Sequence, residues 1–152
     1  MSLLLSRINE APVRGMRCRT VDADGNCLFR AASVALSGDY NLSAGEEYDM
    51  ATELRSAVVA FMRKNRASFE HFVMDDVLDF EQYMQKMETP REWGGEIEVS
   101  AIARLKRRPV HVYQLEGGRY ELLSQYPAGS DACADKISLL FSVRHYDALF
   151  EE

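Results

Sequence analysis

The sequence predicts one α+β domain in which helices pack on a small sheet, and three observations support this prediction. The chain has 152 residues, enough for one hydrophobic core and too few for two ordinary domains. Helical patterns fill its first two thirds, whereas β-branched and aromatic runs fill the last third. Hydrophobic residues make up 47% and charged residues 28% of the chain, as in ordinary globular proteins.

The domain is expected to begin after a short N-terminal extension. Residues 1–16 carry no recognisable pattern and are assigned to this extension, and residues 17–152 to the domain. Polar and apolar side chains alternate over residues 17–21, as a short edge strand requires.

A turn and a helix are predicted next. Residues 22–26 form a turn-rich cluster, and residues 27–36 form a helical run that stops at Gly38. Asn26 or Asp24 is suited to be the N-cap of this helix, because a short polar side chain can accept a hydrogen bond from the first turn.

The middle of the chain predicts four further helices. Residues 45–65 show apolar side chains at three- and four-residue steps, with acidic residues in the first turn and basic residues in the last. Two shorter helices are predicted over 69–74 and 80–87, the latter closed by Pro90. A helix over residues 96–106 follows.

The last third predicts strands. Residues 110–115 are β-branched and aromatic, residues 116–119 signal a hairpin, and residues 120–123 form the return strand. Residues 137–143 predict a mostly buried strand that runs directly into residues 144–147.

Composition and charge argue against several functional classes. The net charge is −6 and the pI about 5.1, so a basic partner is more natural than a nucleic acid, which requires a basic face. No apolar run reaches the length of a membrane span, and the run at residues 3–5 is too short for a signal peptide. We therefore expect a cytoplasmic protein, with the nucleus as the alternative, and no membrane partner.

The cysteine and histidine pattern argues against a disulfide framework and a metal site. The three cysteines, Cys18, Cys27 and Cys133, show no repeating spacing, and an odd number favours a reducing compartment. The chain has no CxxC motif and its three histidines lie far apart in sequence. We therefore expect no bound metal.

Cys27 is the candidate nucleophile. It opens a predicted helix after a turn that contains Gly25, where unpaired N–H groups and the helix dipole favour a thiolate. The same N–H groups can face a developing oxyanion, and Gly25 leaves room for a substrate backbone. The alternative is a small buried structural cysteine, and residue chemistry alone supports both interpretations equally.

His145 is the candidate base, and Asp147 is its candidate partner. Residues two apart in an extended chain face the same side, so Asp147 can hold one ring nitrogen and leave the other free for a thiol. A structural histidine at a strand end and a solvated surface carboxylate are the alternatives. His71 and His111 lie inside predicted elements and are expected to be structural.

Four segments of the chain resemble the signature motifs of the ovarian-tumour (OTU) family of cysteine deubiquitinases. They occur in family order and are residues 24–31 (DGNCLFRA), residues 93–95 (WGG) with Glu96 and Glu98, residues 108–113 (RPVHVY), and residues 145–147 (HYD). Together they span nearly the whole chain, which makes the resemblance far more specific than any one motif.

The resemblance implies a papain-like cysteine peptidase fold, with a small central β-sheet flanked by helices and no cofactor. It implies a thiol protease that hydrolyses isopeptide bonds after the C-terminal glycine of ubiquitin through a thioester. Cys27 would be the nucleophile, His145 the general base and Asp147 the ring orienter, while Asp24 would fix the nucleophile turn. The implied oxyanion hole consists of the backbone N–H groups of Gly25, Asn26 and Cys27.

The resemblance also implies a substrate groove and its ligand. Trp93, Gly94 and Gly95 would line a groove narrow enough for a Gly-Gly tail, and Glu96 and Glu98 would attract the basic residues before it. Alternatively, Trp93 anchors a loop and the carboxylates solvate an exposed helix face. The implied partners are ubiquitin, polyubiquitin chains and ubiquitinated proteins, bound by a monomer. A catalytically silent ubiquitin-binding module and a peptidase for another ubiquitin-like modifier are the alternative functions.

Overall fold

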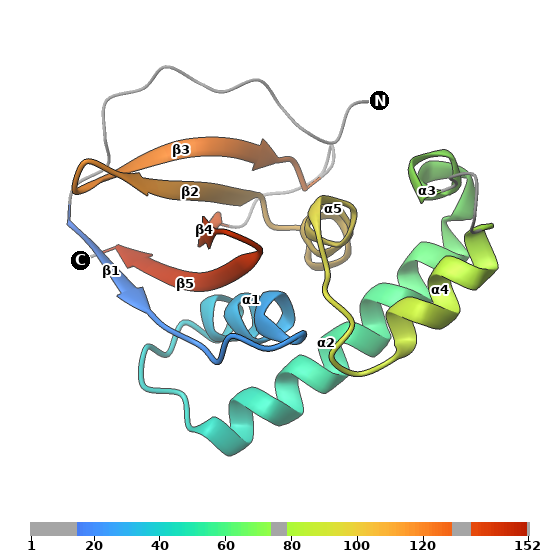
Figure 1. Cartoon of the computed structure of the whole chain (residues 1–152), viewed down its shortest axis with the longest axis horizontal. Coiled ribbons are helices and arrows are strands. Elements are labelled where there is room, and N and C mark those ends of the chain that lie inside the picture. Colours follow the sequence, from blue (N-terminus) through green and yellow to red (C-terminus); the bar gives the residue numbers. More distant parts are fainter. Residues whose placement is uncertain (1–14, 74–78, 129–134, 152) are drawn as a thin grey trace.

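The computed structural model describes residues 15–73, 79–128 and 135–151, and these residues form helices and a mixed sheet (Figure 1). The helices are α1 (Cys27–Ser37), α2 (Ala44–Lys64), α3 (Arg66–Val73), α4 (Phe80–Glu88) and α5 (Glu96–Lys106). The strands are β1 (Met16–Arg19), β2 (Val110–Glu116), β3 (Arg119–Tyr126), β4 (Ile137–Ser142) and β5 (His145–Glu151). The predicted α+β class is thereby confirmed.

The sheet has five strands in the order β1-β5-β4-β2-β3. Strands β2 and β4 pair in parallel, and the other neighbours pair antiparallel. Helix α1 lies between the sheet and α2, so the elements form layers of sheet, first helix and long second helix (Figure 1). The first residue of α1 is thereby brought close to the start of β5.

The main hydrophobic core lies between the helices and one face of the sheet. Adjacent residues of a strand point to opposite faces, so Leu139 joins this core whereas Leu140 joins a smaller cluster on the other face. Ala148 and Leu149 divide in the same way. The site-bearing end of β5 is therefore fixed by packing on both faces.

Helix α2 buries charged residues that its apolar pattern does not predict. Leu54 and Val58, which belong to the apolar pattern, are buried, but Glu47 and Arg55 are buried with them. The prediction counted only apolar side chains, so it could not find these two buried charges. Glu47 pairs with Arg19, and Arg55 binds backbone oxygens. Arg55 lies beside the candidate site.

The chain reverses before His145, where the sequence analysis expected a strand to continue. Ser142 pairs with His145 across a two-residue turn formed by Val143 and Arg144, which adopt positive φ angles of 31° and 63°. Such turns are usually signalled by Asn or Gly, and this turn contains neither residue. His145 is therefore the first residue of β5 and does not follow β4 directly. The expectation that the strand over 137–143 runs directly into residues 144–147 was wrong.

Some predictions fall outside the described residues. The predicted helix over 69–74 corresponds to α3, but Met74 is not described, and neither are Cys133 and residues 1–14. The division into an extension and a domain at residue 17 stays a prediction. Among the described residues, no helix is both long enough and apolar enough to cross a membrane.

Candidate active site

Cys27 is the first residue of α1, and its sulfur contacts the segment that carries His145. The Cys27 side chain is buried, with 1% of its surface exposed. Its Sγ–H donates to the backbone oxygen of Arg144 at 3.9 Å, and the backbone N–H of Tyr146 is near enough to the sulfur to lower the pKa of the thiol. The thiol therefore contacts the residues on both sides of His145.

Burial raises the pKa of the Cys27 thiol and is the largest influence on it. The backbone N–H groups of Tyr146 and Leu28 lower this pKa, and the charges of Asp24 and Asp147 raise it further. The net effect is a pKa above the ordinary value, so the expected thiolate-favouring effect of the helix start is outweighed. The thiol is neutral in this state and needs a base to react.

His145, which is half-buried, and Asp147, which is buried, form a pair on β5. His145 Nε2 lies 2.8 Å from Asp147 Oδ1, and this carboxylate oxygen also accepts a hydrogen bond from the Val21 N–H at 2.9 Å. Asp147 is only 7% exposed, so it is not a solvated surface carboxylate. The two side chains share one side of the strand, as their spacing predicts.

The other imidazole nitrogen is buried and free. His145 Nδ1 has no hydrogen-bond partner within the described ranges. Because Nε2–H is donated to Asp147, Nδ1 keeps a lone pair and can accept a proton. A buried acceptor without a partner is costly, and this nitrogen is available to a reacting group.

Asp24 stabilises the turn that precedes Cys27 through hydrogen bonds. Its Oδ1 accepts from the Asn26 N–H at 2.9 Å, its Oδ2 from the Arg30 guanidinium at 3.3 Å, and its backbone oxygen from the Cys27 N–H at 3.2 Å. Two of the three amides expected in the oxyanion hole, those of Asn26 and Cys27, are thus bonded within the turn in this state.

Gly25 is required by close contact with another loop of the same chain. A Cβ added to Gly25 would lie 1.4 Å from the backbone oxygen of Arg91. The close approach that the sequence analysis expected from a substrate backbone is therefore made by Arg91. Asn26 occupies the N-cap position, but its side chain caps nothing and instead accepts from the Arg91 N–H at 3.0 Å.

Arg55 is a buried residue of the site that the sequence analysis missed. It is 5% exposed, and burial lowers the pKa of its guanidinium. Its Nη2 donates to Gly25 O at 3.1 Å, Asn26 Oδ1 at 2.8 Å and Glu92 O at 2.8 Å, and its Nη1 to Met87 O at 2.9 Å. Ala51 and Val59, four residues away on either side, lie on the same buried face of α2, and this spacing is the sequence signal closest to its inward direction.

Glu98 is buried, so the expectation that it attracts substrate or solvates an exposed helix face was wrong. It is 1% exposed, and its carboxylate accepts from the Gly95 N–H at 2.8 Å and from the Tyr83 hydroxyl at 2.7 Å. Burial raises the pKa of Glu98, although the nearby charge of Arg55 opposes this effect. The carboxylate binds the backbone N–H of the N-cap residue Gly95 at the start of α5 and so fixes the loop before it.

Trp93 links this loop to the histidine turn. Its indole Nε1–H donates to the backbone oxygen of Arg144, the oxygen that also accepts from Cys27. Its ring stacks on Tyr146, with centroids 6.2 Å apart. Trp93 is therefore a loop anchor, one of the two roles considered for it, and it lies beside the thiol.

The residues after Trp93 pack against the same region. A Cβ on Gly94 would meet Leu28 of α1 at 2.9 Å, and one on Gly95 would meet the Trp93 ring at 2.9 Å. Gly94 thus allows the loop to approach α1, and Gly95 leaves room for the Trp93 ring. Glu96 is exposed and accepts from the Tyr126 hydroxyl at 3.3 Å, so it can still meet a partner.

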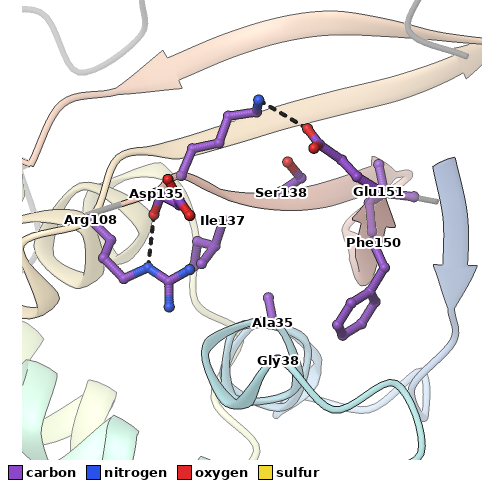
Figure 2. Close-up of a pocket in the computed structure, with 10 residues that line it drawn as sticks. Ala35, Gly38, Arg108, Asp135, Ile137, Ser138, Phe150 and Glu151 are labelled. Atoms are coloured by element: carbon purple, nitrogen blue, oxygen red, sulfur yellow. Dashed lines mark hydrogen bonds and ion pairs between the residues drawn. The ribbon is translucent and has the colours of Figure 1, made fainter. Parts of the chain in front are cut away.

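Other features of the described part of the chain lie apart from this cluster. A pocket of about 440 Å³ lies at the C-terminal end of α1, lined by Arg108, Asp135, Lys136 and Glu151 among others (Figure 2). It contains none of the candidate site residues. Among the described residues, no three His, Cys, Asp or Glu side chains are grouped as metal ligands would be.

An α+β domain in which a cysteine opens a helix beside a histidine–aspartate pair has the architecture of a cysteine protease. The family model described as OTU-like cysteine protease matches residues 22–151. The chain therefore belongs to the OTU family of cysteine proteases, and the predicted family and papain-like fold are confirmed.

Individual relatives agree with this assignment. OTU domain-containing protein 4 of Mus musculus is 29% identical over 90% of this chain and 11% of its own length. Ubiquitin thioesterase otu2 of Schizosaccharomyces pombe is 32% identical over 68% of this chain and 34% of its own length. A solved OTU domain in complex with ubiquitin has a TM-score of 0.65, with 23% identity over 88% of this chain and 69% of that one. The chain thus spans about a tenth of the first curated relative and about a third of the second.

Proposed function

We propose that this domain is a deubiquitinase that hydrolyses isopeptide bonds after the C-terminal glycine of ubiquitin. One observation carries the proposal. The Cys27 sulfur contacts Arg144 and Tyr146, the residues on either side of His145, and Nδ1 of His145 has no hydrogen-bond partner among the described residues. The name of the fission-yeast relative and the ubiquitin complex of the structural neighbour support ubiquitin as the substrate.

The reaction begins with proton transfer. His145 Nδ1 accepts the proton of the Cys27 thiol as the sulfur attacks the terminal glycine carbonyl of ubiquitin. Asp147 stabilises the imidazolium that forms, because its carboxylate accepts from Nε2–H. The raised thiol pKa makes this base necessary.

The tetrahedral intermediate then collapses. Its oxyanion is stabilised by the turn amides of Gly25, Asn26 and Cys27, of which those of Asn26 and Cys27 must first leave their acceptors on Asp24, and His145 protonates the departing lysine amine. A thioester between Cys27 and ubiquitin remains. Water deprotonated by His145 attacks this thioester, which releases ubiquitin and restores the thiol.

The loop after α4 is proposed to receive the ubiquitin tail. Trp93, Gly94 and Gly95 lie against α1 and the histidine turn, so a tail that reaches Cys27 passes them. Exposed Glu96 is placed to attract the basic residues before the terminal glycines. A free thiol at the site suits the reducing conditions of the cytoplasm or nucleus.

The test uses ubiquitin with an electrophile in place of its C-terminal carboxylate. Wild-type protein should form a covalent adduct at Cys27, and Cys27→Ala should form none while keeping its thermal unfolding midpoint. Digestion of a panel of di-ubiquitin linkages should give monoubiquitin with the wild type only.

Two rival functions predict other outcomes. A catalytically silent binding module would bind ubiquitin and form no adduct. A peptidase for another modifier would react with a probe built on a different ubiquitin-like protein and leave the ubiquitin probe untouched. Either outcome would overturn the proposed activity.

A further inference from the structure

Arg55 joins the nucleophile turn to the loop after α4. Its guanidinium donates to the Gly25 oxygen and the Asn26 side chain on one side, and to the oxygens of Met87 and Glu92 on the other. It also lies over the Phe29 ring at 4.4 Å, one turn into α1. The guanidinium thus contacts the two residues before Cys27 and none of the groups proposed to react.

Two charged side chains hold the same peptide unit from opposite ends. Arg55 binds the carbonyl of the Gly25–Asn26 peptide, and the carboxylate of Asp24 binds its N–H at 2.9 Å. The C=O and N–H of a trans peptide point in opposite directions. Fixing the carbonyl toward the buried arginine therefore fixes the N–H away from it.

This peptide unit needs such a restraint. Gly25 must be glycine because the Arg91 backbone leaves no space for a Cβ. Glycine, however, has the freest backbone of any residue, so rotation of the following peptide meets little steric resistance. A flipped peptide would break both hydrogen bonds and turn the Gly25 carbonyl oxygen toward the Asp24 carboxylate, so the turn that carries the amides proposed to face the oxyanion would lose its shape.

We propose that Arg55 is a positioning residue that holds the Gly25 carbonyl inward, so that the oxyanion formed at Cys27 meets amide N–H groups. The inference rests on the proposed function and adds a residue to it. Arg55 acts through the peptide unit before the nucleophile and does not touch substrate.

The test compares binding of ubiquitin aldehyde with binding of unmodified ubiquitin. The aldehyde adds to Cys27 as a hemithioacetal, whose oxygen occupies the oxyanion position, whereas unmodified ubiquitin places no oxyanion there. In Arg55→Gln, affinity for the aldehyde and kcat should each fall about 10- to 100-fold, less than the ~100- to 1000-fold typical of deleting a donor. Affinity for ubiquitin and KM should stay within about 3-fold, because they do not depend on the oxyanion.

Alkylation of Cys27 by iodoacetamide serves as the second measurement, because it needs the thiolate but no oxyanion hole. The rate in Arg55→Gln should stay within about 3-fold of wild type, since the change leaves the proposed base in place. The matched control is Arg19→Gln, because Arg19 also binds backbone oxygens, those of Tyr40 and Leu42, but lies away from the turn. Its affinity for the aldehyde should equal that of wild type.

Different outcomes separate this inference from the proposed function. If wild type binds the aldehyde tightly and Arg55→Gln binds it equally well, the role of Arg55 is wrong and the deubiquitinase remains. If the alkylation rate falls as far as kcat, Arg55 acts through the charge at the thiol, which also overturns the positioning role. If wild type shows no preference for the aldehyde over ubiquitin, both proposals fail.

Arg55→Lys covers the case in which Arg55→Gln does not fold. Lysine keeps a positive charge near Glu98 but lacks the planar fork that reaches several acceptors at once. The same selective loss of aldehyde affinity is expected. Retention of full aldehyde affinity and kcat in Arg55→Lys would show that charge alone suffices and would contradict the positioning role.

Discussion

The two ends of helix α1 differ in how their polar groups are held. At the N-terminal end, Cys27 lies among buried groups that bind one another, including Asp147 and Arg55. At the C-terminal end, an open pocket is bordered by the ion pair between Lys136 and Glu151, whose side chains are 36% and 65% exposed (Figure 2).

The difference shows that a hollow surface does not by itself identify a catalytic site. The pocket at the C-terminal end offers volume but only solvated charges, which contribute little when they pair. The N-terminal end combines an unpaired buried nitrogen, a buried thiol and a glycine that no other residue can replace. Substitutions should therefore have large effects at the N-terminal end and small effects at the C-terminal end.

The largest effect is expected from Asp147. In Asp147→Ala the imidazole loses the partner that holds its Nε2–H, and kcat/KM for ubiquitin cleavage should fall about 100- to 10,000-fold. Asp147→Asn is the control, because an amide oxygen can still accept from the ring. It should keep much more activity, and equal loss in both variants would contradict a role in orienting the ring.

Gly25→Ala should have the next largest effect, on stability. The added Cβ would overlap the Arg91 backbone, which is not a flexible side chain that can move aside. We expect unfolding in urea to show a loss of about 3 kcal/mol or more, as for other severe overpacking. Gly45→Ala is the matched control, since nothing lies within 4 Å of its added Cβ, and it should be neutral or stabilising. Equal stability of the two variants would disprove the close contact.

The raised pKa of the Cys27 thiol predicts how its alkylation rate depends on pH, and this effect is the next in size. A pKa above the ordinary value leaves more Cys27 protonated at neutral pH, so its alkylation rate should rise about tenfold per pH unit up to pH ~9 without levelling. Mass spectrometry of the peptide that carries Cys27 separates it from Cys18, where burial and Asp147 raise the pKa to about 11. A plateau already at pH ~7 would indicate a preformed thiolate–imidazolium pair instead.

The smallest effect is expected at the pocket. Lys136→Ala removes an exposed ion pair with Glu151, so ubiquitin cleavage should change less than about 2-fold and stability by less than about 0.5 kcal/mol. Steady-state kinetics and urea unfolding measure both. A large loss of activity would mean that the pocket belongs to the functional surface and would remove the contrast between the two ends.

The sequence predicted those parts of the molecule that depend on local patterns. Helix α5 has the predicted bounds, and α1 ends at Gly38, whose φ of 70° matches a glycine C-cap. The pairing of His145 with Asp147 followed from the two-residue period of a strand. Each of these features is encoded within a few consecutive residues.

The parts that sequence reasoning missed depend on contacts between distant segments. The inward direction of Arg55 is set by oxygens of Gly25, Met87 and Glu92, none of them near it in sequence. Glu98 looked like an exposed helix charge because its partner Tyr83 lies on another helix. The start of β5 was missed because a turn of Val143 and Arg144 lacks the usual turn residues.

The placement of the imidazole and the carboxylate on one strand makes activity dependent on complete folding. A chain that had formed only the β4–β5 hairpin would possess the proposed base and its proposed orienting acid but not the proposed nucleophile, because Cys27 lies 117 residues before Arg144. Only docking of α1 on that hairpin brings the sulfur to its base. Partly folded chains should therefore hydrolyse no ubiquitin, and recovery of hydrolysis during refolding would report the last stage of assembly.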